Sequence, residues 1–348
     1  MNHGVLELQA IVDGADIPDS DRQEFTALVD VVGPAFGLLA EQAEVDFLEV
    51  ECVLAANFVT AVEARMKRLS DGDQEGFTTE RVGGVVAAKN LPQAADDSRV
   101  AIVFAHETLR ALAGGTVNRA AFVAHEIAHS VLSRVRRMSG ALDGVVFPSQ
   151  TLTEISRSSA RIDWDEFRAE ALADQIIQAM ATVTEAGGGS RPLRLAEISG
   201  PGYLEQAKTQ LAAAYPAWPD RVQAYREYRL ALGDMWIATL RSVGQMRTLM
   251  AMMMGALGID SDAPVDPELA ALPAYRLYFG ALWDEYINTV RHSPILTTVS
   301  EHREIELTVL RAGEASFRFA LLALGLTADD LPDRQAHVHV VAPQRLQS

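Results

Sequence analysis

The sequence has little that could cross-link it or carry it through a membrane. Cys52 is the single cysteine among 348 residues, and no Cys-x-x-Cys pair occurs. An intramolecular disulfide and a cysteine zinc or redox site are therefore excluded, which fits a reducing compartment. The longest apolar runs, 249–259 and 317–326, are shorter than the ~20 residues that span a bilayer. The first residues also lack the basic start and apolar stretch of a signal peptide, so we expect a cytoplasmic protein without a membrane span.

Basic residues are also scarce. The chain has 30 Lys and Arg against 47 Asp and Glu, which gives a formal charge of −17. Such a surface repels polyanions, so we do not expect nucleic acid as a partner. With 49 % hydrophobic and 22 % charged residues, the composition is that of a folded globular protein. Its length allows one large domain or two ordinary ones.

The first half of the chain mixes helix and strand patterns. We expect helices at 1–45, 57–69, 118–138 and 163–184, with an irregular segment at 139–162. Alternating or short apolar patterns predict strands at 46–54, 78–89 and 100–105. The Gly- and Pro-containing stretch at 187–192 is the best candidate for a domain boundary.

The second half is dominated by helical patterns. We expect helices at 202–214, 220–256, 267–290 and 303–325, and an alternating pattern at 337–341 predicts a short strand. The whole chain therefore divides into four parts. They are an N-terminal helical segment at 1–45, a domain of mixed helices and strands at 46–190, a helical region at 191–330 that shapes or covers that domain, and a tail at 331–348.

The helix predicted at 118–138 contains the sequence His125-Glu126-Ile127-Ala128-His129, which is a His-Glu-x-x-His motif. Four helical steps of about 100° place His125 and His129 on one face, one turn apart, where both imidazoles can reach one zinc ion. Glu126 lies one step round the helix and can act as the general base on a water that zinc activates. Two incidental histidines on a buried helix are the alternative, but buried imidazoles and a buried carboxylate need partners, and a metal supplies them.

A catalytic zinc takes three protein ligands and leaves one position open. Leu132 and Val135 stand where metzincins have Gly and His, which excludes that class. On the next helix, Glu170 and Asp174 are four residues apart and share a face. Glu170 could ligate zinc while Asp174 supports a histidine ligand. Glu166, one turn earlier, is the competing ligand; we favour Glu170 because of its acidic partner four residues on.

These motifs resemble those of the gluzincin metallopeptidases, in which His-Glu-x-x-His is followed on a later helix by Glu-x-x-x-Asp. The variant Glu170-Ala171-Leu172-Ala173-Asp174 is similar to that of the minigluzincin and prenyl-protein peptidase groups, here without their membrane helices. The resemblance covers about residues 46–185. It implies zinc held by His125, His129 and Glu170, with Asp174 orienting His125. It also implies an extended substrate bound along an edge strand at 100–105.

Other polar residues have no assigned role from the pattern. Gluzincins use a downstream residue to stabilise the oxyanion, and Tyr203, His292 and His302 are candidates between which the spacing does not choose. His106 and Glu107 are interpreted as a surface or turn pair.

The sequence thus predicts an α+β fold, in which a small sheet packs on an active-site helix in the manner of zincins, followed by a mainly helical C-terminal region. The expected function is zinc-dependent hydrolysis of peptide bonds in a peptide or protein substrate, with Glu126 as the base. One alternative is a zinc-binding regulatory or interaction protein, in which the site is structural or vestigial and the helical half binds a protein partner. Another is a metal-dependent hydrolase of a non-peptide amide. The pattern does not predict an oligomeric state.

Overall fold

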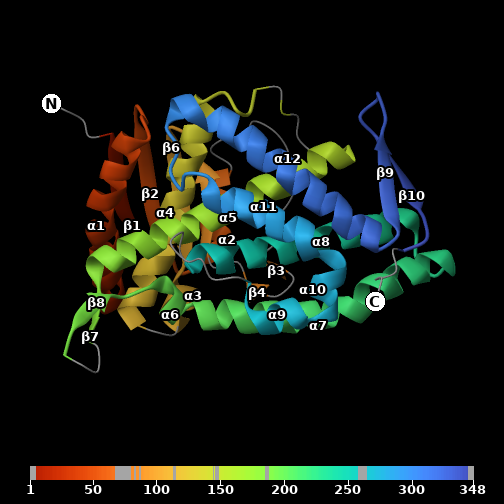
Figure 1. Cartoon of the computed structure of the whole chain (residues 1–348). Coiled ribbons are helices and arrows are strands. Elements are labelled where there is room, and N and C mark those ends of the chain that lie inside the picture. Colours follow the sequence, from red (N-terminus) through yellow and green to blue (C-terminus); the bar gives the residue numbers. More distant parts are fainter. Residues whose placement is uncertain are drawn as a thin grey trace. The chain divides into compact units, whose positions relative to one another are not determined.

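The computed structural model describes residues 5–66, 80–81, 84–85, 88–112, 115–143, 145, 149–184, 188–257 and 265–343 (Figure 1). Contacts divide the chain into two compact units. The first comprises 1–143, 168–198 and 295–303, and the second 144–167, 199–294 and 304–348. Helices α5 (Leu152–Met180) and α12 (Val299–Ala323) each contribute to both units.

The first unit is built on a four-stranded sheet in the order β1-β2-β6-β5. β1, β2 and β6 are parallel, and β5 runs antiparallel to β6. The elements of this unit, besides parts of α5 and α12, are β1 (Leu6–Asp13), α1 (Asp19–Gln42), β2 (Leu48–Ala55), α2 (Phe58–Met66), β3 (Glu80–Arg81), β4 (Gly84–Val85), β5 (Ala88–Pro92), β6 (Arg99–Ala105), α3 (His106–Ala111), α4 (Gly115–Met138), β7 (Thr182–Thr184), β8 (Ser190–Pro192) and α6 (Leu195–Ile198).

Helices α1 and α4 cover one face of this sheet. The Phe104 ring on β6 contacts Phe25 of α1 at a centroid distance of 5.5 Å and Phe122 of α4 at 5.9 Å. A separate apolar cluster packs α2 residues such as Val62 against Val53 and Val103 of the strands. Because strand side chains alternate between faces, Val103 lies on the face opposite Phe104. The active-site helix predicted at 118–138 is therefore α4, seated on a small mixed sheet, and the predicted α+β class is confirmed.

Two predictions about strands are wrong. The segment at 1–45 is not helical throughout, because Leu6–Asp13 forms the edge strand β1, with Leu8 paired to Val50 of β2. Leu, Glu, Gln and Ala favour a helix locally, but pairing with a buried parallel strand overrides that propensity. The strand at 100–105 is present as β6 but lies inside the sheet; among the described strands, β5 is the edge beside it. Much of the strand predicted at 78–89 lies outside the described residues.

The predicted irregular segment at 139–162 is also partly wrong, since α5 begins at Leu152. Its start is a capping box. The Thr151 hydroxyl accepts a hydrogen bond from the Glu154 N–H at 3.1 Å, and the Glu154 carboxylate accepts one from the Thr151 N–H at 3.2 Å. The Asp330 carboxylate accepts further hydrogen bonds from the N–H groups of Leu152 and Thr153. These contacts fix where α5 starts.

The second unit is mainly helical, as the pattern predicted. The helix expected at 220–256 is divided near residue 230, and the one expected at 267–290 is divided into three. Besides parts of α5 and α12, the elements are α7 (Gly200–Arg226), α8 (Leu232–Ala256), α9 (Pro267–Ala271), α10 (Pro273–Tyr278), α11 (Gly280–His292), β9 (Leu326–Asp330) and β10 (Ala336–Val340), the last of which confirms the predicted strand at 337–341.

A buried ion pair lies in the core of the second unit. Arg247 and Asp163 both have 0 % side-chain exposure, and the Arg247 Nε donates to the Asp163 carboxylate at 2.9 Å. The guanidinium carbon lies 5.2 Å from the Trp283 ring centroid and 4.9 Å from that of Tyr286, within cation–π range. Burial raises the pKa of Asp163 to about 6 although Arg247 lowers it. Each buried charge of the pair is thus stabilised by the opposite charge of its partner.

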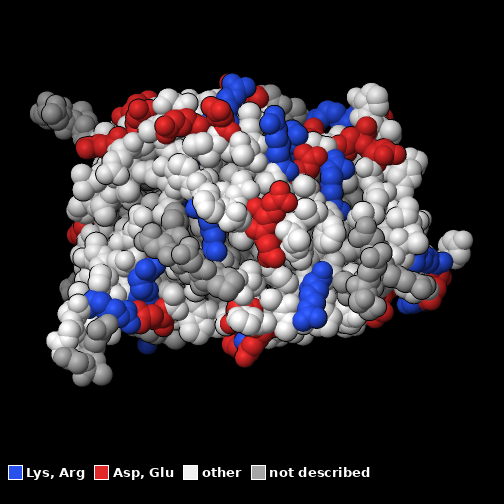
Figure 2. Space-filling model, in the orientation of Figure 1, with Lys and Arg blue, Asp and Glu red and all other residues white. Residues whose placement is uncertain are grey.

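Three further observations concern surface and compartment. None of the described helices combines the length and the apolar character that a bilayer span requires. Burial raises the pKa of the Cys52 thiol to about 12, so the sulfur stays protonated and unreactive at neutral pH. On the face drawn in Figure 2, the Lys and Arg side chains stand singly among Asp and Glu.

We predict that Arg247→Met lowers the free energy of unfolding by about 3–5 kcal/mol, because it leaves the Asp163 carboxylate buried without its cation. The double variant Asp163→Asn/Arg247→Met should recover most of that loss. Arg241→Met changes an exposed arginine on the same helix and should stay within about 0.5 kcal/mol of wild type. Urea unfolding measures all three. A cost below 1 kcal/mol for Arg247→Met would show that the pair does not hold this core together.

Candidate metal centre

Helix α4 places the two motif histidines side by side. Their Nε2 atoms are 3.0 Å apart, and their ring centroids are 4.7 Å apart. His125 is 7 % exposed, and Ala124, Ile127 and Ala128 around the pair are fully buried. The helix is amphipathic, and its apolar face packs toward the sheet, so the backbone beneath the imidazoles is fixed by the core. The predicted approach of His125 and His129 is thus present in the structure.

Helix α5 supplies the carboxylates. Glu166, Glu170 and Asp174 follow one another at four-residue intervals, so all three lie along one face of the helix. His125, His129 and Glu166 each offer one ligand atom, and these three atoms lie within 4.8 Å of one another. The residue that the structure gathers with the histidines is therefore Glu166, which the sequence left as the competing ligand.

Glu170 lies on the other side of the His125 ring. Its Oε1 is 3.3 Å from the Nδ1 of His125, and the residue is 4 % exposed. This is the position of a carboxylate that orients a ligand histidine through its second ring nitrogen. Glu170 as a direct ligand stays a prediction.

Asp174 contacts a different part of the chain. Its carboxylate accepts hydrogen bonds from the side chains of Gln178 at 2.7 Å and Arg194 at 3.0 Å, and from the N–H of Leu195 at 2.6 Å. These bonds join α5 to the segment before α6. The carboxylate near the Nδ1 of His125 is that of Glu170, at 3.3 Å.

Asn90 on the edge strand β5 holds the general-base candidate Glu126. Its Nδ2 donates to the Glu126 carboxylate at 2.8 Å and to the Glu126 main-chain carbonyl at 3.2 Å, while its Oδ1 accepts from the Ser130 hydroxyl at 2.9 Å. The second carboxylate oxygen of Glu126 has no hydrogen-bond partner among the described residues. Sequence reasoning missed Asn90, because nothing local marks a strand residue that contacts a helix 36 residues later.

The remaining histidines and Tyr203 lie in other surroundings. The Nε2 of His106 is 2.8 Å from the Asp21 carboxylate. His302 is buried in the first unit, with its Nδ1 2.8 Å from the Thr297 hydroxyl. His292 is exposed at the end of α11, and Tyr203 packs on the core of the second unit. None of the three oxyanion candidates is singled out by these contacts.

The donor set fits zinc. Two nitrogens bound to one tetrahedral zinc at about 2.05 Å lie about 3.3 Å apart, close to the 3.0 Å between the two Nε2 atoms. Two imidazoles and one glutamate carboxylate form a donor set found in catalytic zinc sites, which keep the fourth position open. The residues present could therefore hold the ion after a shift of a few tenths of an ångström.

No protein-family model, curated protein sequence or solved structure matches the chain. The resemblance to gluzincins consequently rests on the motif residues alone.

We predict about one zinc ion per chain and an unequal effect of the two glutamates. Glu166→Ala should remove a ligand and weaken zinc binding more than Glu170→Ala, whose expected loss of about 10–100-fold is that of an orienting group. Glu63→Ala, an exposed glutamate on α2, is the matched control and should keep full affinity. Competition with a chromogenic chelator gives the affinities. The reverse order of the two losses would make Glu170 the ligand.

Proposed function

We propose that the protein is a zinc-dependent hydrolase of peptide bonds. The observation that carries the proposal is the convergence of ligand atoms from His125 and His129 of α4 and Glu166 of α5 within 4.8 Å. Beside His125 on α4, the Glu126 carboxylate accepts a hydrogen bond from Asn90 of the edge strand. A purely structural metal site does not require a carboxylate such as that of Glu126, which is held beside the ligands but is not one of them. Geometry and chemistry thus favour catalysis over a structural role.

His125, His129 and Glu166 would hold the zinc ion, and Glu170 would fix the ring of His125 through its Nδ1. When bound, zinc lowers the pKa of a water and polarises the substrate carbonyl. The buried small side chains around the histidines limit the access of bulk water to the two rings.

Glu126 moves the proton in this proposal. One of its carboxylate oxygens is held by Asn90, and the other is left to accept a proton from the attacking water. The same carboxylic acid then gives the proton to the nitrogen of the leaving amine, which completes hydrolysis without a net change at Glu126. Asn90 is a positioning residue, because it acts on the reaction through Glu126.

The edge strand gives a reason to propose a peptide as the substrate. β5 is an edge of the described sheet, and an extended peptide can add to such an edge by main-chain hydrogen bonds. Asn90 is on this strand, so a peptide added there would lie beside Glu126. Pro92 at the strand's end suits an edge, where a missing N–H is tolerated. The single buried cysteine supports a cytoplasmic location.

We predict that Glu126→Gln keeps the zinc ion and lowers kcat by about 10²–10⁴-fold, because it removes the base and no ligand. Turnover is measured on a broad peptide library by mass spectrometry, and zinc by elemental analysis of the same samples. A wild-type protein that holds zinc but cleaves no peptide, while it binds a protein partner, would favour the regulatory alternative. If the protein cleaves non-peptide amides and no peptides, the alternative of a non-peptide amide hydrolase is favoured.

We predict that Asn90→Ala lowers kcat by about 10-fold with little change in KM or zinc content, because the Glu126 carboxylate loses the donor that orients it. Gln93→Ala is the matched control, since that amide bonds only main-chain carbonyls of Leu91 and Pro92. A rise in KM at unchanged kcat would mean that Asn90 binds substrate instead of positioning Glu126.

A further inference from the structure

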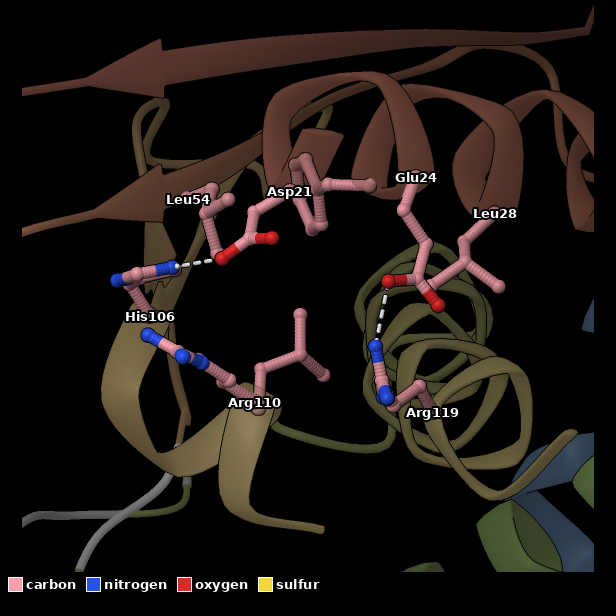
Figure 3. A pocket seen from close by; sticks show the side chains of 9 residues that line it. Asp21, Glu24, Leu28, Leu54, His106, Arg110 and Arg119 are labelled. Carbon is pink, nitrogen blue, oxygen red and sulfur yellow. Dashed lines mark hydrogen bonds and ion pairs between the residues drawn. The ribbon is translucent and has the colours of Figure 1, made fainter. Parts of the chain in front are cut away.

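A second polar pocket lies in the first unit, outside the candidate metal centre (Figure 3). It is lined from α1, the end of β2, α3 and the first turns of α4. Four apolar side chains, all buried, form its floor: Phe25, Leu28, Leu54 and Leu109. Charged side chains surround this floor. The enclosed space is about 20 Å³, enough for a group of about the size of one water.

Two ion pairs stand on opposite sides of the pocket in Figure 3. On one side, the His106 Nε2 lies 2.8 Å from the Asp21 carboxylate. On the other, Arg119 of α4 pairs with Glu24 of α1, and the Thr116 hydroxyl donates to the same carboxylate at 3.0 Å. The hydrogen bond from His106 lowers the pKa of Asp21. Both carboxylates of the rim are thus already engaged.

Arg110 differs from the other basic groups of the rim. It is exposed, and its charge lowers the pKa of Asp21, but no hydrogen bond or ion pair joins its guanidinium to a described residue. In Figure 3 it stands on the same side as His106 and across the pocket from Arg119. A guanidinium offers five N–H donors in a planar fork that matches a carboxylate.

We propose that this pocket takes an oxygen of the carboxylate group of a small organic acid, with Arg110 as its main donor and Arg119 across from it. A monoanion suits a rim on which two arginines and a histidine face two carboxylates. Phosphate is disfavoured, because Asp21 and Glu24 repel a dianion more strongly than a monoanion.

The carboxylate could belong to a free acid or to the C-terminus of a peptide, and the two sources share this chemistry. Binding does not depend on the proposed hydrolase activity, since no residue of the pocket belongs to the candidate metal centre. Peptide capture here would make the C-terminus of the substrate a recognition element, which is a consequence that rests on the proposed function.

The experiment is a titration of the full-length protein with N-acetylalanine, its amide, the acid and amide forms of acetyl-trialanine, and inorganic phosphate. Calorimetry gives the affinities, and methyl NMR shifts of Leu28, Leu54 and Leu109 locate the ligand. We expect each acid to bind at least about 10-fold more tightly than its amide, because a charge-assisted hydrogen bond is lost in the amide. Tighter binding of the trialanine acid than of N-acetylalanine would identify a peptide C-terminus as the ligand.

Variants assign the donors. Arg110→Gln should weaken binding of the acids about 10-fold, and Arg241→Gln, which changes an exposed arginine of the second unit, should leave it unchanged. Because Arg119→Gln alone would leave Glu24 without its partner, the double variant Glu24→Gln/Arg119→Gln is the fair test of Arg119. Equal binding of acids and amides, unchanged binding in Arg110→Gln, tighter binding of phosphate, or shifts confined to other methyl groups would each overturn the proposal.

Discussion

The close approach of two imidazoles on a buried helix is the constraint on which the candidate site depends. The Nε2 atoms of His125 and His129 are 3.0 Å apart. At this distance, either one ring donates a hydrogen bond to the other or both nitrogens bind the same cation. Glu166 and Glu170 add two carboxylates to the same surroundings. The proposed divalent ion would offset both carboxylates and take both nitrogens as ligands.

Neighbouring elements hold these side chains in place. The sheet fixes the backbone of α4 through the rings of Phe25, Phe104 and Phe122. The capping box at Thr151 and Glu154 fixes the start of α5, and with it the phase of the acidic face. Since the sheet, and not a loop, carries Asn90, the orientation of the Glu126 carboxylate is tied to the core. Each polar group of the candidate site thus has a rigid element behind it.

The sequence predicted the helices and strands that have strong periodicity, but it did not predict which distant residues contact one another. The strands at β2 and β6 and helix α4 follow from local patterns, and the paired histidines follow from helical geometry. The sequence favoured Glu170 over Glu166 as the third ligand because Asp174 follows it four residues on, but Glu170 follows Glu166 at the same spacing, so the pattern does not decide between them. β1 was missed because helix-forming residues pair there with a distant strand. Asn90 was missed because its contact with Glu126 exists only in the folded chain.

Zinc-edge anomalous diffraction from crystals of the protein tests the central claim most directly. With data collected above and below the zinc absorption edge, the account predicts one strong difference peak within bonding distance of both Nε2 atoms of His125 and His129 and of the Glu166 carboxylate. Absence of that peak in zinc-supplemented crystals, with the two imidazoles hydrogen-bonded to each other, would contradict it.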